Sequence, residues 1–291
     1  HRGKTLPVHS TAGWVATIGC DGQEDTMRAI AHDTYGAADA PGVETRPATP
    51  ARSERTVKTI GRSIAGQQKA GGLAALYLAA AYLLAMPFFL LLVDYQSAVD
   101  PAAKVASLVT NHGAMQVMYL ITYVVFGIAL AILALALYER LKPAAPALMQ
   151  TATAVALIWA VLLVASGLVF NAGMGAVVTL SPSNPAQAAS MWQAIEPVSD
   201  GLSCVDGEIL GGLWVLLVSI AGLRVGGFSR ALGWFGVMVG AIGLASMIPP
   251  LTDLAILFGL AQIGWFAWLG VTMLRPTERS EQPLPIKESF A

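Results

Sequence analysis

The sequence predicts an all-α protein, a polytopic transmembrane helical bundle of about six spans with both chain ends in the cytoplasm and a disordered N-terminal tail. Composition is the first reason: 55% of the 291 residues are hydrophobic and 12% are charged, and the mean hydropathy is +0.62. A soluble domain needs a more polar surface than this balance allows. The second reason is a series of six apolar runs, each near the roughly 20 residues that cross about 30 Å of hydrocarbon. The third is the one-sided distribution of Lys and Arg.

The six predicted spans follow one another from Gly71 onward. They are expected at about 71–93, 114–138, 148–170, 205–223, 231–248 and 252–274. Pro87 is expected to kink the first span, because its ring removes one backbone hydrogen bond. Pro249 and Pro250 end the fifth span sharply, so the fifth and sixth spans are expected to form a tight helical hairpin.

The spans divide the chain into three predicted regions. Residues 1–69 are interpreted as a disordered cytoplasmic tail, because "TYGAADAPGVETRPATPARSER" is rich in Ala, Pro, Gly, Thr and charge and has no hydrophobic period. Residues 70–275 form the six-helix transmembrane domain, and residues 276–291 form a short cytoplasmic tail. The stretch "RSERTVKTIGRSIAGQQK" is basic. It is either a juxtamembrane segment that binds anionic lipid or a solvated linker.

The orientation follows from the basic residues that flank the spans. One side of the predicted bilayer has only Lys104. The other side has twelve, namely Arg52, Arg55, Lys58, Arg62, Lys69, Arg140, Lys142, Arg224, Arg230, Arg275, Arg279 and Lys287. The positive-inside rule therefore predicts that both ends are cytoplasmic. The predicted location is a bacterial cytoplasmic (inner) membrane.

Both long outer loops are expected to contain a short helix. "DPAAKVASLVTN" offers Asp100 as N-cap and Pro101 as first helical residue, and "SNPAQAASMWQAI" offers Asn184 and Pro185 in the same roles. These helices are expected to lie on the outer membrane face or to cap the bundle.

The stretch "SDGLSCVDGEILGG", residues 199–212, carries the main candidate site. Asp200 and Asp206 are interpreted as the rim and the cap of the fourth span, whose positively polarised N-terminus faces out. Glu208 is expected about 6 Å below the outer edge if the span begins near Cys204. Inside the hydrocarbon layer a carboxylate must face the bundle interior, water or a partner.

The second span offers a polar stripe on one face, with His112, Gln116, Tyr119 and Tyr123 at i, i+4, i+7 and i+11. The stripe and the fourth span both start at the outer surface, so they are interpreted as an outward-facing polar pocket. The candidate ligand-binding residues are His112, Gln116, Tyr119, Asp206 and Glu208. The alternative is a hydrogen-bonded contact between helices that only holds the bundle together.

A second pattern predicts close helix packing in the fifth span. Gly233, Gly236, Gly240 and Gly243 lie at i, i+3, i+7 and i+10, on one face. Small residues of this kind let helix backbones approach each other in lipid, either within the chain or across a dimer. Gln262, in the sixth span, is expected to form a hydrogen bond between helices.

No catalytic residue, cofactor or metal site is predicted, and enzymatic activity is not favoured. Intramembrane proteases and metal hydrolases need a nucleophile with a base, or clustered His and carboxylate residues, and the sequence shows neither pattern. The formal net charge of -1 gives no support to nucleic-acid binding.

Three stretches carry a resemblance to a known family: "QQKAGGLAALYLAAAYLL", "GEILGGLWVLLVSIAGLRVGGFSRALGWFGVMVGAIGL" and the closing hairpin. They resemble a bacterial family of six-helix membrane proteins known as domain of unknown function 4386. The resemblance spans about residues 67–275 and departs from the family at Ser229, where the family has Pro. It implies the fold and implies no activity or site residues.

Two classes of function remain open. The favoured one is a noncatalytic structural, sensory or partner-binding membrane protein, because it needs no chemistry that the sequence lacks. Its partners would be the lipid bilayer and a second copy or another protein. The alternative is a binder or transporter of a small polar or cationic ligand that enters the pocket from outside. An enzyme acting on lipid is weaker, since no residues for it are found.

Overall fold

The computed structural model describes residues 50–93, 95–203 and 208–275, with side chains placed from Ala65 onward. The chain divides between Glu54 and Arg55 into two units, and the following description concerns the second unit within those ranges. All regular structure in the described part is helical, and no strand occurs there. The predicted all-α class is therefore confirmed for these residues.

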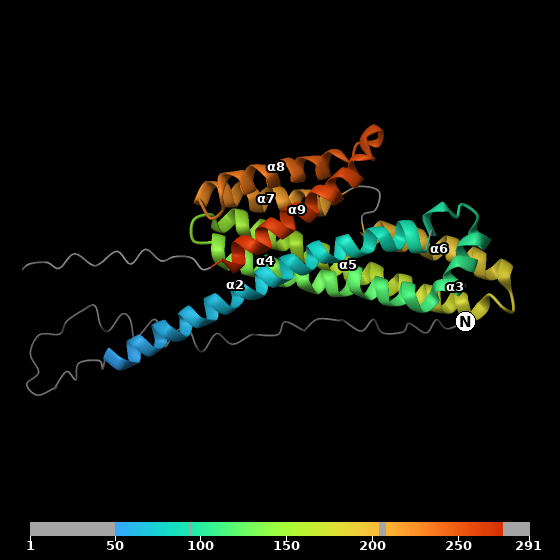
Figure 1. Cartoon of the computed structure of the whole chain (residues 1–291), viewed down its shortest axis with the longest axis horizontal. Helices are drawn as coiled ribbons and strands as arrows, with labels where there is room; N and C mark the ends of the chain where they lie inside the picture. Colours follow the sequence, from blue (N-terminus) through green and yellow to red (C-terminus); the bar gives the residue numbers. More distant parts are fainter. Residues whose placement is uncertain (1–49, 94, 204–207, 276–291) are drawn as a thin grey trace, which may run out of the picture. The chain divides into compact units, whose positions relative to one another are not determined.

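The helices follow the order of the predicted apolar runs (Figure 1). Short π-helical and 3-10 segments interrupt them: η1 (Phe88–Leu92), η2 (Tyr95–Ser97), η3 (Leu120–Val125) and η4 (Pro249–Leu251). The α-helices are α2 (Pro50–Pro87), α3 (Pro101–Tyr119), α4 (Phe126–Leu141), α5 (Pro146–Leu180), α6 (Pro185–Ser203), α7 (Ile209–Val225), α8 (Arg230–Ala245) and α9 (Leu254–Leu274).

Four helical segments of the described chain are long and apolar enough to cross a membrane, judged by length and composition. They are Ala65–Leu92, Pro101–Leu141, Pro146–Leu180 and Leu254–Leu274. The helices at the fourth and fifth predicted spans, α7 and α8, are apolar but have only 17 and 16 residues. The structure thus contains four candidate membrane-spanning helices and two shorter apolar ones.

Helix α2 begins at Pro50, well before the predicted domain boundary at residue 70. Residues 50–69 are therefore helical, which corrects that part of the predicted disordered tail. No proline interrupts the chain between Pro50 and Pro87, so an apolar helix can continue into a polar stretch that has no hydrophobic period of its own. The rest of both predicted tails, 1–49 and 276–291, lies outside the described residues.

Helices α3, η3 and α4 form one continuous run with two irregular points. Asn111 leaves helical geometry, with φ −108° and ψ 15°, and residues 120–125 are π-helical. A π-turn changes the direction of the side chains that follow it and is often found at functional sites. The Tyr77 hydroxyl of α2 donates to the Ile121 carbonyl oxygen at 2.7 Å, which ties the π-helical segment to α2.

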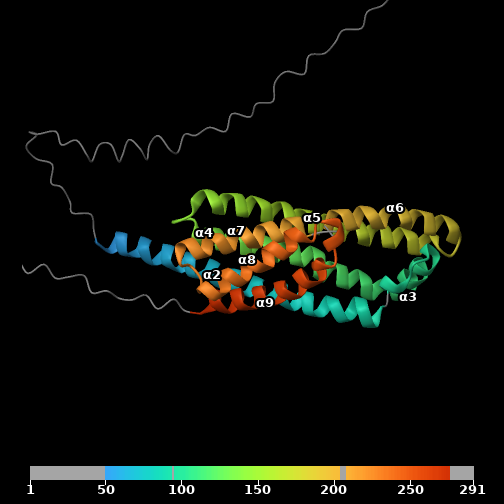
Figure 2. The ribbon, with the colours of Figure 1, turned by 90° about the horizontal axis from the view of Figure 1, so that it is seen from above.

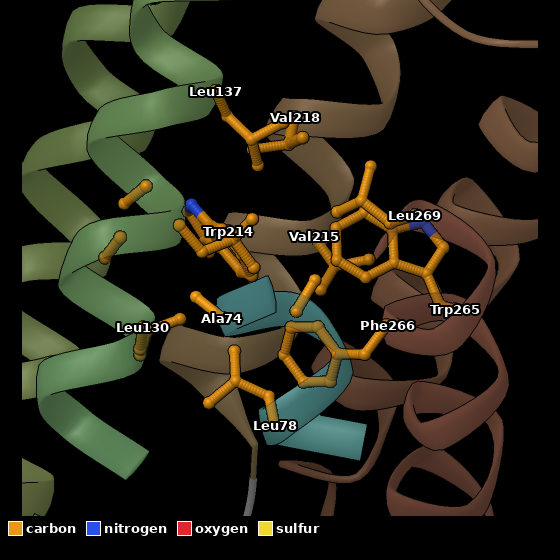
Figure 3. Packing of buried hydrophobic residues seen from close by; sticks show 14 of the residues in the cluster. Ala74, Leu78, Leu130, Leu137, Trp214, Val215, Val218, Trp265, Phe266 and Leu269 are labelled. Carbon is orange, nitrogen blue, oxygen red and sulfur yellow. The ribbon is translucent and has the colours of Figure 1, made fainter. Parts of the chain in front are cut away.

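The buried hydrophobic side chains form two clusters, named here the bundle core and the outer core. In the bundle core, Trp214, Trp265 and Phe266 meet α2 and α4 residues such as Leu78 and Leu130 (Figure 3). The outer core gathers buried residues of α3, the C-terminal half of α5 and α6, including Leu108, Met115, Phe170, Met174 and Trp192. Figures 1 and 2 show α3 and α6 beside the end of α5 that is remote from α7, α8 and α9.

Helices α5 and α6 form an antiparallel hairpin. Asn184 is the N-cap of α6 as predicted, since its Oδ1 accepts from the backbone N–H of Gln187 at 3.1 Å. The helix that follows has 19 residues and packs along α5 rather than forming a short surface helix. Midway along α5, the Ser166 hydroxyl donates to the Ser199 carbonyl oxygen near the end of α6 at 2.8 Å, and the Ser199 hydroxyl lies 3.2 Å from the Ser166 carbonyl oxygen.

Helices α7 and α8 pack with their backbones in contact. A Cβ at Gly240 would lie 2.7 Å from both the Gly212 carbonyl oxygen and the Leu216 nitrogen. The other glycines of the predicted stripe also face neighbours within this chain: Gly233 meets Leu223, Gly236 meets Ser219 and Trp265, and Gly243 meets Gly212 and Phe258. The connection between the two helices is short because Gly226 adopts φ 65°, the left-handed geometry that ends α7.

Candidate functional site

Glu208 immediately precedes α7, yet its side chain does not cap that helix. Its backbone N–H donates to the Ser246 hydroxyl oxygen at 3.2 Å. The carboxylate turns toward Gly211 instead. A Cβ built on Gly211 would lie 3.0 Å from Glu208 Oε2, 3.0 Å from Phe258 Cζ and 3.1 Å from Trp159 Cη2. Glu208 therefore meets one ring from α9 and one from α5 in the space that Gly211 leaves.

The Oε2 atom of Glu208 is buried and has no hydrogen-bond partner among the described residues, although the residue as a whole is half-buried. Its carboxylate forms no ion pair within the described part of the chain either. The ring edges of Phe258 and Trp159 carry partial positive charge, but they supply neither a proton nor a full charge. A buried carboxylate is normally paired or hydrogen-bonded. This one lacks a partner from the described chain.

Gln262 lies one turn after Phe258 on the same face of α9 and is 0% exposed. Neither its amide oxygen nor its amide nitrogen has a partner in the described ranges, so the predicted hydrogen bond between helices is not observed there. The indole nitrogen of Trp159 is buried without a described partner as well. We call Glu208, Gly211, Trp159 and Phe258 the Glu208 site.

Two tyrosines on other helical segments interact electrostatically with Glu208. The phenol groups of Tyr82, on α2, and Tyr123, in η3, lie within electrostatic range of the Glu208 carboxylate. Tyr123 also interacts with Asp200 of α6. The Tyr82 ring packs edge-to-face on Phe126, with centroids 5.3 Å apart. The Glu208 site is thus adjacent to both the bundle core and the outer core.

The predicted polar stripe is split between different surroundings. Tyr119 and Tyr123 stay together, because their rings stack with centroids 4.9 Å apart, and Tyr119 also stacks on Phe170 with centroids 3.5 Å apart. Gln116 is exposed and His112 is half-buried. His112 precedes Tyr123 by eleven positions, about 16 Å along a helix. The predicted stripe requires an uninterrupted helix, while the irregular points at Asn111 and η3 change how the stripe faces its neighbours.

Asp206, a predicted ligand-binding residue, lies outside the described residues. Asp200, the predicted rim residue, belongs to the last turns of α6 and interacts electrostatically with Tyr95, Tyr119 and Tyr123. The structure therefore places Tyr123 within electrostatic range of Glu208, together with Tyr82, which was not predicted from the sequence.

A polar cluster in the outer core was not predicted from the sequence. Lys104 Nζ and Glu196 Oε1 form an ion pair at 2.7 Å, and their side chains are 25% and 15% exposed. The Tyr95 hydroxyl donates to the same Glu196 oxygen at 2.7 Å and accepts from Trp192 Nε1 at 2.6 Å. Burial and, next, the hydrogen bond to Glu196 raise the pKa of Tyr95. The available signal was Lys104, the single basic residue of the outer loops.

This polar cluster differs from the Glu208 site because its members satisfy one another. Tyr95 belongs to η2, Lys104 to α3, and Trp192 and Glu196 to α6. The cluster therefore ties three separate segments together, which is a structural role.

Two further features also lack polar ligand chemistry. No described group of three or more His, Cys, Asp or Glu side chains is placed to hold a metal ion. A groove of about 240 Å³ between α4 and α5 is lined by Gly, Ala, Val, Leu and Ile alone.

Comparison with known proteins adds no functional information. No protein-family model, curated protein or solved structure matches this chain. The resemblance to the six-helix family of unknown function therefore stays a prediction, as do the expected second copy or protein partner and the anionic lipid. What the protein does must be inferred from its own residues.

Proposed function

We propose that this chain is an integral protein of a bacterial cytoplasmic (inner) membrane that crosses the bilayer six times, with both ends in the cytoplasm. Helices α7 and α8, at 17 and 16 residues, are about 25 Å long, close to the roughly 27–30 Å of a thin hydrocarbon layer. Arg140 Nη2 donates to the Gly227 carbonyl oxygen at 3.1 Å, so the basic end of α4 meets the loop between α7 and α8. The positive-inside rule assigns such a basic end to the cytoplasm.

In this arrangement α3, α6 and the C-terminal half of α5 form a helical lobe on the outer side. Helix α5 has 35 residues, about 52 Å, against about 30 Å of hydrocarbon. The C-terminal half of α5, which includes this additional length, contains outer-core residues such as Phe170 and Met174. Glu208 then lies at the junction between the membrane bundle and the outer lobe.

At this junction, the protein binds a small ligand at the Glu208 site. The observation that carries this proposal is the buried Oε2 atom of Glu208, which has no hydrogen-bond partner among the described residues. A carboxylate kept only to start the helix would cap α7, as the Ser229 hydroxyl caps α8 by accepting from Leu232 at 3.2 Å. Burying an unpaired carboxylate destabilises the fold. Ligand binding accounts for that destabilisation, whereas a purely structural role does not.

Glu208→Gln in the full-length, detergent-purified protein tests the proposal, because the amide keeps the shape of the side chain and removes its charge. Asp253→Asn is the matched control, since Asp253 is an exposed carboxylate just before α9. The measurement is the thermal unfolding midpoint with a panel of amines, alcohols, sugars, amino acids and carboxylic acids. A ligand at one hundred times its Kd stabilises the folded state by about 2.7 kcal/mol.

We expect at least one compound to raise the midpoint with concentration in the wild type and in Asp253→Asn, and not in Glu208→Gln. The variant itself should stay close to wild-type stability without ligand, because the amide keeps the shape of the carboxyl group. If no compound separates Glu208→Gln from the other two proteins, the carboxylate is not a ligand-binding group and the proposed function is wrong.

A further inference from the structure

We infer that the groove between α4 and α5 binds an acyl chain of an anionic phospholipid from the cytoplasmic leaflet of the membrane. The inference rests on the membrane orientation proposed above and is independent of the Glu208 site. The groove has a volume of about 240 Å³ and is lined by Gly, Ala, Val, Leu and Ile residues alone. Such a lining offers nothing to a polar group, whereas it matches the chemistry of an alkyl chain.

The shape of the groove suits a single chain better than a helix of a second copy. Its floor is made by small residues, and a Cβ on Gly127 would lie 2.7 Å from the Ala160 carbonyl oxygen, so the two backbones already touch there. Its rims are branched side chains, with Ile128 53% and Val161 66% exposed. These rims hold a helix about 10–12 Å wide away from the floor. The volume is also below the roughly 300–1,000 Å³ of pockets for drug-sized ligands.

The depth of the groove matches the length of an acyl chain. Two of its lining residues, Gly127 and Ala131, precede Lys142, the C-cap of α4, by 15 and 11 positions. These separations are about 16–23 Å along a helix. Half of the hydrocarbon layer is about 15 Å thick. A lipid with its headgroup at the cytoplasmic end of α4 therefore reaches the groove with the distal part of its acyl chain.

One face of the α4–α5 hairpin leads from the groove to polar groups at the cytoplasmic end. Four residues of α4 and its C-cap share this face at i, i+4, i+11 and i+15: Gly127, Ala131, Tyr138 and Lys142. The last two lie together, since Lys142 Nζ is 5.1 Å from the centre of the Tyr138 ring. On α5, the exposed Gln150 lies two turns before the groove residue Leu157 on the same face. This end therefore offers an ammonium group and an amide to a lipid headgroup.

The charge at this end selects an anionic headgroup. Among the described side chains of the cytoplasmic end, Glu139 is the one acidic group, whereas six are basic: Lys69, Arg140, Lys142, Arg224, Arg230 and Arg275. Lys142 Nζ pairs with Glu139 Oε1 at 2.7 Å, with the two side chains 39% and 33% exposed. An ammonium group has three donors, so Lys142 can bind a lipid phosphate as well. On the outer side, Lys104 is already paired with Glu196, which favours the cytoplasmic leaflet.

The test compares two lipids that have the same acyl chains. Dioleoyl phosphatidylglycerol is anionic, and dioleoyl phosphatidylcholine has no net charge. Each is titrated into the delipidated full-length protein in detergent, and native mass spectrometry counts the bound lipids. Ala131→Phe fills the groove, and Ala80→Phe is its control because Ala80 is an exposed alanine of α2 outside the groove. Lys142→Gln removes the charge at the headgroup, and Arg230→Gln is its control because Arg230 is exposed at the start of α8.

We expect one saturable site for phosphatidylglycerol in the wild type, with a Kd about fivefold lower than that for phosphatidylcholine, the effect of about one basic residue at a lipid surface. The site should be lost in Ala131→Phe and kept in Ala80→Phe, Arg230→Gln and Glu208→Gln. In Lys142→Gln the preference for phosphatidylglycerol should disappear. Glycerol 3-phosphate, which has no acyl chain, should not displace the lipid.

Three results overturn the inference. Equal binding of the two lipids by the wild type removes the anionic headgroup. A phosphatidylglycerol site that survives in Ala131→Phe lies elsewhere on the protein. A dimeric wild type that becomes monomeric in Ala131→Phe makes the groove an interface between copies.

A second pair of variants decides if Ala131→Phe does not fold. Val161→Trp covers the groove from its exposed rim, and Ile158→Trp is its control because Ile158 is exposed on the same helix outside the groove. The lipid site should be lost in the first and kept in the second, and equal binding by both overturns the inference. None of these results depends on Glu208, so the proposed ligand site and the lipid site fail separately.

Discussion

The contact between α7 and α8 predicts a large effect from one methyl group. In Gly240→Ala the new Cβ would lie 2.7 Å from two backbone atoms of α7, the Gly212 carbonyl oxygen and the Leu216 nitrogen, whereas ordinary contact begins at 3.4 Å. The difference is 0.7 Å, so the two helices must separate by about that much or bend. Backbone atoms cannot rotate away as the end of a flexible side chain can.

The expected net loss of stability is about 1–2 kcal/mol. Overpacking of a well-packed interface costs about 1–3 kcal/mol, and the better helix propensity of Ala offsets up to about 1 kcal/mol of it. Gly259→Ala provides the comparison, because it gains the same propensity on α9 with no described heavy atom within 4 Å of the new Cβ.

Thermal unfolding in detergent, followed by circular dichroism, measures both variants against the wild type. We expect Gly240→Ala to unfold a few degrees below the wild type, and Gly259→Ala at or above it. The packing argument is refuted if Gly240→Ala is as stable as Gly259→Ala, since α7 and α8 would then not touch at Gly240.

Two further predictions concern topology and pH. With Cys20 and Cys204 replaced by Ser, an impermeant maleimide applied to intact cells should label Ser183→Cys, in the exposed α5–α6 turn, and spare Ala144→Cys, in the exposed α4–α5 turn; the reverse pattern contradicts the proposed orientation. Burial raises the pKa of Tyr95, so its contribution is complete below the unfolded pKa of about 10 and is lost as pH rises through the folded pKa. Wild-type stability should then fall above about pH 10 more steeply than that of Tyr95→Phe, by up to about 1.4 kcal/mol per pH unit, and parallel curves would contradict it.

Much of the secondary structure could be predicted because it depends on local features. Each of the six apolar runs overlaps a helix of the described chain. The N-caps at Asp100 and Asn184 occur as expected, since a capping side chain and the N–H group it accepts from are three residues apart. The start of α2 was missed because a polar helix that continues an apolar one needs no hydrophobic period.

The candidate site was predicted only in part. Glu208 stood out because an acidic residue beside an apolar run is rare. Trp159 and Phe258 gave no signal, since one aromatic residue in an apolar helix looks like any other core residue. The predicted partner stripe relied on a regular helix, which Asn111 and η3 interrupt.

By itself, the sequence determined the helical class, the order of the helices and the separation of basic from acidic loops. These properties depend on the composition of short segments and on the 3.6-residue period. Only the tertiary structure decided that Lys104 pairs with Glu196, that α8 presents its glycines to α7, and that the Glu208 carboxylate turns away from its own helix toward Gly211. Such contacts depend on the angles and distances between helices that are far apart in the chain, and local patterns do not encode them.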